Sequence, residues 1–269
     1  MSVYKNDNPD FLQVALDSML VNQSRVPNEI FMVIDGPVPE TINRVIDDYI
    51  SSYKRVFTIH RLKENKGLGN ALRIGVEKAK YDIIARMDSD DICLQYRFEK
   101  QLEYITQHPD VDIVGGQCTE FIGTPDNIVS RGSVPLNNED IYTYMKTRCG
   151  MSHVTVMFKR ESILRAGNYQ DWFWNEDYYL WIRMMLMKSK FANVPDVYVN
   201  VRTGDDQYSR RGGMKYFKSE AGLQRFMYKN NVIPFYLYLS NVIKRFVIQI
   251  IIPDNIRGWV FRNIIRKIE

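Results

Sequence analysis

A cluster of aspartates could bind a metal ion. Asp88, Asp90 and Asp91 follow the short apolar run 83–87, which is typical of a buried strand. Carboxylates two positions apart at a strand end can converge on one hard cation, and without a cation they would repel one another. Mg²⁺ or Mn²⁺ bound in this way completes its coordination shell with substrate phosphates and water. We therefore expect Asp88 and Asp90 to be metal ligands. The alternative is a solvated acidic turn, because Asp-x-Asp is common by chance.

Two other predicted strands also end in residues that suit a nucleotide sugar. Tyr4 follows the first strand and could stack on a base, and Asp35 follows the second and could accept a hydrogen bond from a base or a ribose. In an open α/β sheet, ligands bind at the carboxyl ends of the strands. An aspartate after a strand is also common in ordinary turns. A single strand end is therefore weak evidence for a nucleotide-sugar site, and the three strand ends together are stronger evidence.

Two further segments could serve the same reaction. Asn65-Lys66-Gly67 is a small turn before a predicted helix, where free N–H groups and the charge of Lys66 would suit a phosphate. Glu176 and Asp177 stand at the start of an aromatic helix, where an acid could act as a general base on an acceptor hydroxyl. On the residues alone, capping of that helix is the favoured explanation for the two acids. His153 is better explained as a structural histidine.

The elements that must position these groups alternate between strand and helix. Such alternation indicates right-handed β-α-β units and a mainly parallel sheet. The first strand reads as the end of a longer one, as if the sequence were truncated or its start misplaced. The expected strands are 2–4, 30–34, 57–62, 83–87, 111–116 and 154–158, and the expected helices are 9–20, 42–49, 68–79, 95–107, 138–146 and 177–188.

The composition fits a globular protein and restricts its partners. With 269 residues, 45% of them hydrophobic and 25% charged, the chain can form one α/β domain. A net charge of +4 suits an anionic partner such as a nucleotide or a lipid headgroup. The basic residues lack interleaved stacking aromatics, which argues against a nucleic-acid partner. Cys93, Cys118 and Cys149 are scattered, which argues against a disulfide framework and a cysteine zinc site and favours the cytoplasm.

Taken in order along the chain, these motifs resemble the family 2 glycosyltransferases of the GT-A fold. The resemblance covers about residues 1–210. The matching segments are Ser2-Val3-Tyr4, Ile34-Asp35-Gly36, Asn65-Lys66-Gly67 with Ala71 and Gly75, Met87-Asp88-Ser89-Asp90-Asp91, Arg97, the segment 152–158, and Glu176-Asp177 with Leu180-Trp181. Arg202-Thr203-Gly204-Asp205-Asp206 and Arg210-Arg211-Gly212-Gly213 are similar to the subgroup that builds bacterial capsule and exopolysaccharide repeat units, including amylovoran-type transferases.

The resemblance implies a fold, a reaction and roles for particular residues. The fold would be a Rossmann-like, mixed but mostly parallel sheet flanked by helices. The reaction would be an inverting, metal-dependent transfer from a nucleotide-diphosphate sugar, with a UDP-sugar favoured, to a saccharide or lipid-linked saccharide acceptor. Asp177 would be the catalytic base. The binding residues would be Val3, Tyr4 and Asp35 for the nucleotide, Lys66 beside it, and Asp88 and Asp90 for ribose and metal.

The carboxyl-terminal segment 213–269 is helical, apolar and basic, and we separate it from a transferase domain at 1–212. Over 235–252 the polar residues share one helical face, and a second amphipathic stretch follows. Basic amphipathic helices can lie in a membrane interface, so we expect a peripheral protein at the anionic inner face of the cell membrane. The alternative is helices packed on the domain with a solvated basic face. The polar residues are Ser240, Asn241, Lys244, Arg245 and Gln249, and the later stretch opposes Trp259, Val260, Ile264 and Ile268 to Arg257, Arg262, Arg266 and Lys267.

Two other functions fit parts of the sequence. A sugar nucleotidyltransferase shares the sheet, but it carries a glycine-rich, arginine-containing loop after the first strand, and residues 4–8 contain no glycine. A catalytically inactive homologue could act as a membrane-bound assembly or binding subunit. The retention of Asp88, Asp90 and Asp177 argues against this second alternative.

Overall fold

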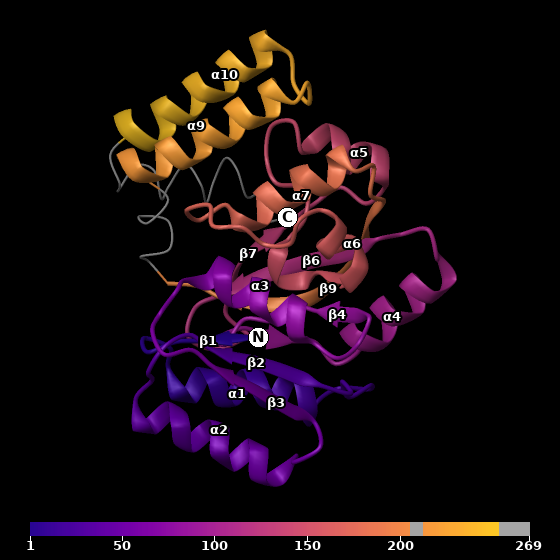
Figure 1. Ribbon diagram of the computed structural model, residues 1–269, viewed down its shortest axis with the longest axis vertical. Coiled ribbons are helices and arrows are strands. Elements are labelled where there is room, and N and C mark those ends of the chain that lie inside the picture. The colour runs from indigo at the N-terminus through magenta and orange to yellow at the C-terminus, as the bar shows by residue number, and fades with distance from the viewer. Residues whose placement is uncertain (205–211, 253–269) are drawn as a thin grey trace.

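The computed structural model describes residues 1–204 and 212–252, and their strands form two sheets. The first part of the chain builds a three-stranded parallel sheet, and the middle builds a six-stranded mixed sheet. Figure 1 shows the first sheet towards one end of the molecule and two helices, α9 (Met214–Lys229) and α10 (Phe235–Phe246), at the opposite end. The predicted α/β architecture with helices flanking the strands is confirmed.

The first sheet follows the expected strand and helix alternation. Its strands are β1 (Ser2–Val3), β2 (Ile30–Ile34) and β3 (Phe57–Arg61), and the helices between and after them are α1 (Pro9–Leu20), α2 (Glu40–Ser52) and α3 (Leu68–Lys78). Helix α1 begins where the sequence predicts, because Pro9 occupies the first turn and the Asn8 side chain caps it by accepting the Asp10 N–H at 2.8 Å. All three strands are parallel, so their carboxyl ends meet at one edge.

The second sheet departs from the predicted parallel order. Its strands are β4 (Ile83–Ala85), β5 (Ile92–Cys93), β6 (Ile113–Phe121), β7 (Ile128–Gly132), β8 (Met157–Lys159) and β9 (Phe191–Arg202). Strand β4 does not extend the first sheet; it pairs antiparallel with β8, and in this sheet only β6 and β9 run parallel. Periodicity locates a strand but does not reveal its partner, so the antiparallel pairing of β4 with β8 could not be predicted from the sequence.

The remaining helices surround this sheet. They are α4 (Arg97–Gln107), α5 (Asn138–Tyr144), a 3₁₀ turn (His153–Thr155), α6 (Arg160–Arg165), α7 (Glu176–Leu186), α9, α10 and a π-helical turn (Val247–Ile251). The expected strand 154–158 begins only at Met157, so His153 lies in the 3₁₀ turn and not at a strand start.

Two large hydrophobic cores and a smaller cluster around Val33, Ala71 and Ile74 hold these layers together. The first lies between α1, α2 and the first sheet and includes Leu16, Ile34 and Ile46. The second surrounds α7 and includes Trp181, which is fully buried, and Leu223 of α9. Helix α9 therefore shares a core with the elements that precede it.

The amino terminus lies beside an apolar cavity between the two sheets. The Met1 ammonium donates a hydrogen bond to the Phe31 carbonyl oxygen at 3.0 Å, and burial together with the Arg86 charge lowers its pKa to about 6. The cavity has a volume of about 370 Å³ and is lined by residues of both β2 and β4. Among the described strands, none pairs across it. The expectation that the first strand starts before Met1 stays a prediction.

A buried arginine on α4 fixes the end of β4. The Nη2 of Arg97 donates to the Arg86 carbonyl oxygen at 2.7 Å and to the Val156 carbonyl oxygen at 3.3 Å. Its Nε donates to Gln101, whose amide donates in turn to the Thr155 carbonyl oxygen at 2.8 Å. The side chain therefore joins α4 to β4 and to the segment before β8, immediately before the aspartate cluster begins.

We expect Arg97→Met to lower the free energy of unfolding by about 2–4 kcal/mol, because two buried carbonyl groups lose their donor and each costs ~1–3 kcal/mol. Urea denaturation followed by circular dichroism measures this change. Arg44→Met is the matched control, since the Arg44 side chain is 73% exposed, and it should change the value by less than about 0.5 kcal/mol. Equal effects of the two substitutions would contradict the assignment.

Candidate active site

Three aspartates lie together in the loop between β4 and β5. Asp88, Asp90 and Asp91 each place a carboxylate oxygen so that the three atoms lie within 4.8 Å of one another. Strand β4 ends at Ala85, earlier than expected, so the cluster sits in the loop and not directly on the strand end. Several oxygen ligands at short range are what a hard cation requires, and these residues therefore fit the predicted metal site.

Burial and mutual repulsion raise the pKa values of two of these acids. For Asp90, burial is the larger cause and the charges of Asp88 and Asp7 add to it, which raises its pKa to about 6. The pKa of Asp91 is raised well above its usual value by burial and then by the charges of Asp88 and Asp90. Ionising all three acids is therefore unfavourable unless positive charge lies close by, and a divalent cation would supply it.

Two arginines border the cluster. The buried Arg86 forms an ion pair with Asp88 through Nη2, while its Nε and Nη1 have no hydrogen-bond partner in the described part of the chain. From the end of β9, Arg202 donates its backbone N–H to Asp91 Oδ1 at 2.9 Å and its Nε to the Asp90 carbonyl oxygen at 3.2 Å. Asp91 is buried and held by Arg202, and the assignment of Asp88 and Asp90 as metal ligands stays a prediction.

A fourth acid, Asp7, adjoins the cluster and was missed by the sequence reasoning. Its Oδ2 accepts the Tyr4 N–H at 3.0 Å and the Ser89 hydroxyl at 2.9 Å. Burial raises the pKa of Asp7, and its charge contributes to the raised pKa of Asp90. The signal was present, because Asp7 lies in the loop after β1, at the same edge of the sheet as Asp35 after β2.

Asp35 stands at the carboxyl end of β2, where it holds the turn before α3. Its side chain is buried, with Oδ1 accepting the Lys66 N–H at 2.7 Å and Oδ2 accepting the Gly67 N–H at 2.9 Å. These two N–H groups therefore serve the turn and are not free for a phosphate. Gly36 has a φ of 88°, and a Cβ there would lie 2.6 Å from the Asn65 nitrogen, so the contact between the two loops requires glycine.

The other predicted nucleotide contacts differ in exposure. The Tyr4 side chain is 39% exposed at the carboxyl end of β1, as stacking on a base would require. The Lys66 side chain is also exposed. Val3 is fully buried and its carbonyl oxygen accepts the Asp35 N–H at 2.8 Å, so its side chain faces the core. The nucleotide-binding roles of Val3, Tyr4, Asp35 and Lys66 stay predictions.

Helix α7 begins with the two acids Glu176 and Asp177. The residue that precedes the helix, Asn175, makes no side-chain capping bond, and neither acid occupies the capping position. Burial, and then the charge of Asp177, raises the pKa of Glu176 to about 7, and the charge of Asp88 adds to this rise. The charge of Asp88 therefore reaches Glu176, and a Cβ added to Gly69 at the start of α3 would lie 3.5 Å from the Glu176 Cβ, so the start of α7 lies against the start of α3.

His153 lies against the proposed base. Its Nδ1 is 3.8 Å from Asp177 Oδ2, and its Nε2 is 2.9 Å from the Tyr169 hydroxyl. Burial, followed by the charge of Arg86, lowers the pKa of His153 well below its usual value. The ring is therefore neutral at physiological pH. The histidine expected to be purely structural thus contacts Asp177.

Trp174 stands beside the two acids in a strained conformation. Its φ is 56°, in the left-handed region, and its side chain is 48% exposed. Such strain persists only where the surroundings impose it, and it is frequent at functional sites. An exposed indole at this position could stack on a sugar ring.

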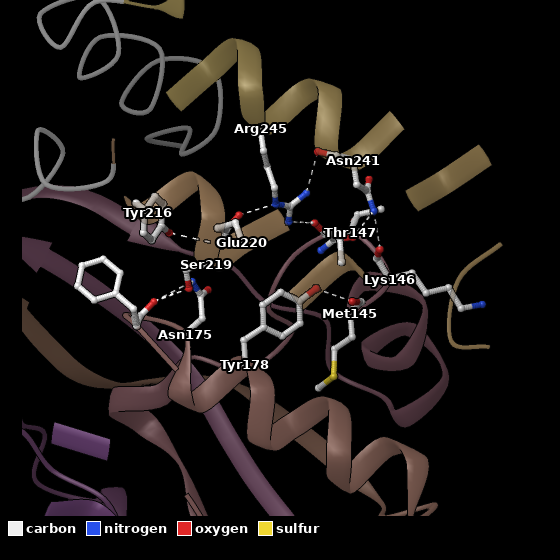
Figure 2. Close-up of polar contacts among 12 residues, drawn as sticks. Met145, Lys146, Thr147, Asn175, Tyr178, Tyr216, Ser219, Glu220, Asn241 and Arg245 are labelled. Atoms are coloured by element: carbon white, nitrogen blue, oxygen red, sulfur yellow. Dashed lines mark hydrogen bonds and ion pairs between the residues drawn. The ribbon is translucent and has the colours of Figure 1, made fainter. Parts of the chain in front are cut away.

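The segment that leads into α7 is held by α9. Trp172 Nε1 donates to the Ser219 carbonyl oxygen at 3.1 Å, and Asn175 Nδ2 donates to the Ser219 hydroxyl oxygen at 3.2 Å. That hydroxyl donates to the Phe173 carbonyl oxygen, and Figure 2 shows Ser219 beside Asn175. Helix α9 therefore positions the segment that carries the two acids.

Some motifs lie outside the described residues. Asp205-Asp206 and Arg210-Arg211 fall within 205–211, and the second amphipathic stretch with its four basic residues falls within 253–269. The interpretations given to them above stay predictions.

Comparison of the sequence with known proteins gives close matches. The family model described as Glycosyl transferase family 2 matches residues 1–173. The chain is 38% identical over 225 residues to the amylovoran biosynthesis glycosyltransferase AmsE of Erwinia amylovora, with 84% of this chain and 83% of that protein covered. It is 34% identical over 269 residues to the UDP-Gal:alpha-D-GlcNAc-diphosphoundecaprenol beta-1,3-galactosyltransferase of Escherichia coli, with 99% and 95% covered.

Solved structures share the fold at low sequence identity. S. aureus TarS 1–349 in complex with UDP-GlcNAc has a TM-score of 0.67 at 12% identity, over 97% of this chain and 78% of that chain. The mannosyltransferase PcManGT from Pyrobaculum calidifontis, in complex with GDP-Man and Mn²⁺, has a TM-score of 0.64 at 13% identity, over 96% and 72%. These likenesses agree with the predicted GT-A fold.

We expect the stability of the metal-free protein to fall between about pH 4 and about pH 7. The pKa of Asp90 is about 6 in the folded protein and about 3.9 in an unfolded chain. The folded state therefore binds this proton more tightly, and the stabilisation is lost as the pH rises through the folded value. Asp91 acts in the same direction. Melting temperatures measured in EDTA across this range test the expectation.

Two variants and the addition of Mn²⁺ show whether the aspartate cluster causes this pH dependence of the melting temperature. Asp90→Asn should make the melting temperature less dependent on pH, whereas Asp48→Asn, an exposed position on α2, should not. Mn²⁺ should restore stability at the higher pH, because the cation replaces the protons. The same pH dependence in all three proteins would contradict the assignment.

Proposed function

This chain belongs to glycosyltransferase family 2, and from that premise we propose that it transfers a sugar from a nucleotide-diphosphate donor to a saccharide hydroxyl with inversion of the anomeric carbon. The name of AmsE, which refers to amylovoran biosynthesis, supports a role in making a bacterial polysaccharide. One observation carries the proposal: the carboxylate oxygens of Asp88, Asp90 and Asp91 lie within 4.8 Å of one another, and the charge of Asp88 reaches Glu176 at the start of α7. A single site can thus combine groups for a metal-bound diphosphate with a base for a hydroxyl.

The proposed donor is a UDP-sugar. The relative from Escherichia coli is named for UDP-Gal, and TarS was solved with UDP-GlcNAc. In this chain the exposed ring of Tyr4 would stack on the base, and Asp35 would reach the nucleotide from the end of β2. Because both oxygens of Asp35 already accept backbone N–H groups, the residue would also act by holding the turn that contains Lys66.

The proposed acceptor is a lipid-linked saccharide. Support comes from the name of the Escherichia coli relative, which specifies a diphosphoundecaprenol substrate. Such an acceptor would place the protein peripherally at the inner face of the cell membrane. Trp174 is the side chain we propose to contact the acceptor sugar, because it is exposed beside the two acids. Within residues 1–204 and 212–252, no helix is long and apolar enough to cross a membrane.

A divalent cation, Mg²⁺ or Mn²⁺, would be held by Asp88 and Asp90. Bound there, it would supply positive charge against the leaving diphosphate. Arg86 already pairs with Asp88 and keeps that carboxylate in place. Arg202 restrains the cluster from the side of Asp91.

We propose Asp177 as the base of a single displacement. It removes the proton of the acceptor hydroxyl while the hydroxyl oxygen bonds to the anomeric carbon. The bond from that carbon to the diphosphate oxygen breaks, and its electron pair leaves with the nucleotide diphosphate. Attack opposite the leaving group inverts the anomeric configuration. The neutral His153 next to Asp177 adds no positive charge that would weaken the base.

We expect the purified protein to release UDP from a UDP-sugar when Mn²⁺ and an acceptor are present. A donor panel of UDP-, GDP- and TDP-sugars, read by nucleotide release, identifies the donor. Asp90→Asn and EDTA should each remove this activity, because the leaving diphosphate loses its countercharge. Full turnover in EDTA would overturn metal dependence. Donor binding without any release across the panel would instead favour the catalytically inactive homologue.

We expect Asp177→Asn to lower kcat by about 10²–10⁴-fold, the usual contribution of a general base. Its affinity for UDP, measured by calorimetry, should stay unchanged, because the base acts on the acceptor. Glu176→Gln is the matched control: it should keep more activity and should alter the pH profile near 7, where Glu176 titrates. Loss of UDP affinity in Asp177→Asn would move this residue to the donor side of the site.

A further inference from the structure

Helix α10 and the π-helical turn after it present an apolar surface to the solvent. Seven of their large apolar side chains are exposed, by 39% for Val247 up to 73% for Tyr236. Many of them recur three or four positions apart, so they share one side of the helix. A surface helix normally buries that side, and a contiguous exposed apolar patch marks an interaction site. This patch, which we call the outer face, consists of Phe235, Tyr236, Leu239, Ile243, Phe246, Val247 and Ile251.

Asn241, Arg245 and Gln249, on the polar side of the same helix, point into the protein. A helix packed on the domain with its polar face in solvent would show the opposite orientation. Asn241 and Gln249 are only 2% and 6% exposed. The Asn241 amide donates to the Lys146 carbonyl oxygen at 2.9 Å and to the Gln224 side chain at 2.8 Å. Figure 2 shows this inward side, with Asn241 and Arg245 reaching from α10 towards α9 and the loop after α5.

A buried ion pair fixes this orientation. Arg245 pairs with Glu220 of α9, and both side chains are almost 90% buried. The Arg245 Nη2 also donates to the Thr147 carbonyl oxygen at 2.7 Å. Rotating α10 to bury its apolar side would separate the pair and leave a charge buried without a partner, which is strongly unfavourable. The outward position of the apolar side is therefore set by the inward contacts.

The hairpin of α9 and α10 is also basic. Glu220 is the single acid in 212–252, and it is already paired with Arg245. Exposed apolar and aromatic side chains among positive charges match a lipid surface that carries negative headgroups. The exposed basic residues are Lys215, Lys218, Arg225, Lys229 and Lys244.

We propose that the outer face of α10 docks the protein on an anionic lipid bilayer, with its apolar side chains at the boundary between headgroups and acyl chains. The docking itself is inferred from this surface alone. The role that we give to docking, which is to bring the site to a lipid-linked acceptor, rests on the proposed function. Helix α9 lies between the outer face and the segment before α7, which Ser219 holds. Docking would therefore set the acceptor end of the site near the membrane.

Sedimentation of the full chain with vesicles of phosphatidylcholine and phosphatidylglycerol tests the proposal. The double variant Leu239→Gln/Ile243→Gln should bind at least about tenfold more weakly, because two apolar side chains no longer enter the interface. The matched control is Val21→Gln/Val26→Gln, which changes side chains 60% and 46% exposed near the end of α1. Both variants alter exposed positions, so we expect them to be as stable as the parent. Melting temperatures equal to that of the parent confirm that they fold.

The charge contribution is tested separately. Lys244→Glu should weaken binding about tenfold or more at low salt, and the difference should shrink at high salt because the charges are screened. Lys54→Glu, exposed in the turn after α2, should have little effect. Vesicles of phosphatidylcholine alone should bind less protein than the anionic ones.

Three outcomes would overturn the proposal. Full-length protein could stay in the supernatant with anionic vesicles at low salt. The double variant could bind as well as the parent, which would assign binding to another part of the chain. The double variant could convert a dimer to a monomer without lipid, which would make the outer face an interface between two copies. Nucleotide release with a water-soluble acceptor tests the proposed function independently. If no nucleotide is released but the protein still binds vesicles, the proposed function fails and the docking proposal stands.

Discussion

Mutual repulsion among closely spaced carboxylates is the constraint on which the site depends. The oxygens of Asp88, Asp90 and Asp91 lie within 4.8 Å of one another, and burial together with that proximity raises the pKa values of Asp90 and Asp91. The fold opposes the repulsion from two directions. Arg86 pairs with Asp88 at the end of β4, and Arg202 reaches Asp91 from β9. The mixed second sheet is therefore needed for the site, because the pairing of β9 with β5 and β6 brings β9 to the cluster.

The strand-end rule predicted part of this site and could have predicted more. Asp35 and the aspartate cluster were found because parallel strands share one carboxyl edge. Asp7 obeys the same rule, but only its contact with Ser89 shows that it belongs to the cluster. Arg202 could not be assigned from periodicity, since its role depends on the pairing of β9 with β5 and β6. The family resemblance, and not spacing, identified Asp177, and His153 became relevant only through folding.

The carboxyl-terminal helices show a different limit of sequence reasoning. The pattern of α10 divides it correctly into a polar and an apolar side, but the pattern does not say which side faces the protein. That choice depends on groups distant in the chain, namely Glu220 and the carbonyl oxygens of Lys146 and Thr147. Polar side chains that satisfy buried partners can outweigh the usual burial of apolar ones, because an unpaired buried charge or carbonyl is costly.

The same hairpin connects a surface to the chemistry of the site. Helix α10 is fixed to α9 by Arg245 and Glu220, and α9 holds the segment before α7 through Ser219. The second hydrophobic core extends this link, since Leu223 of α9 packs in the same cluster as Trp181 of α7. Each contact in the series is a polar contact that is at least partly buried or lies within the core, so the hairpin and α7 should move as one unit. A ligand that engages α10 would thus act on the element that presents the two acids.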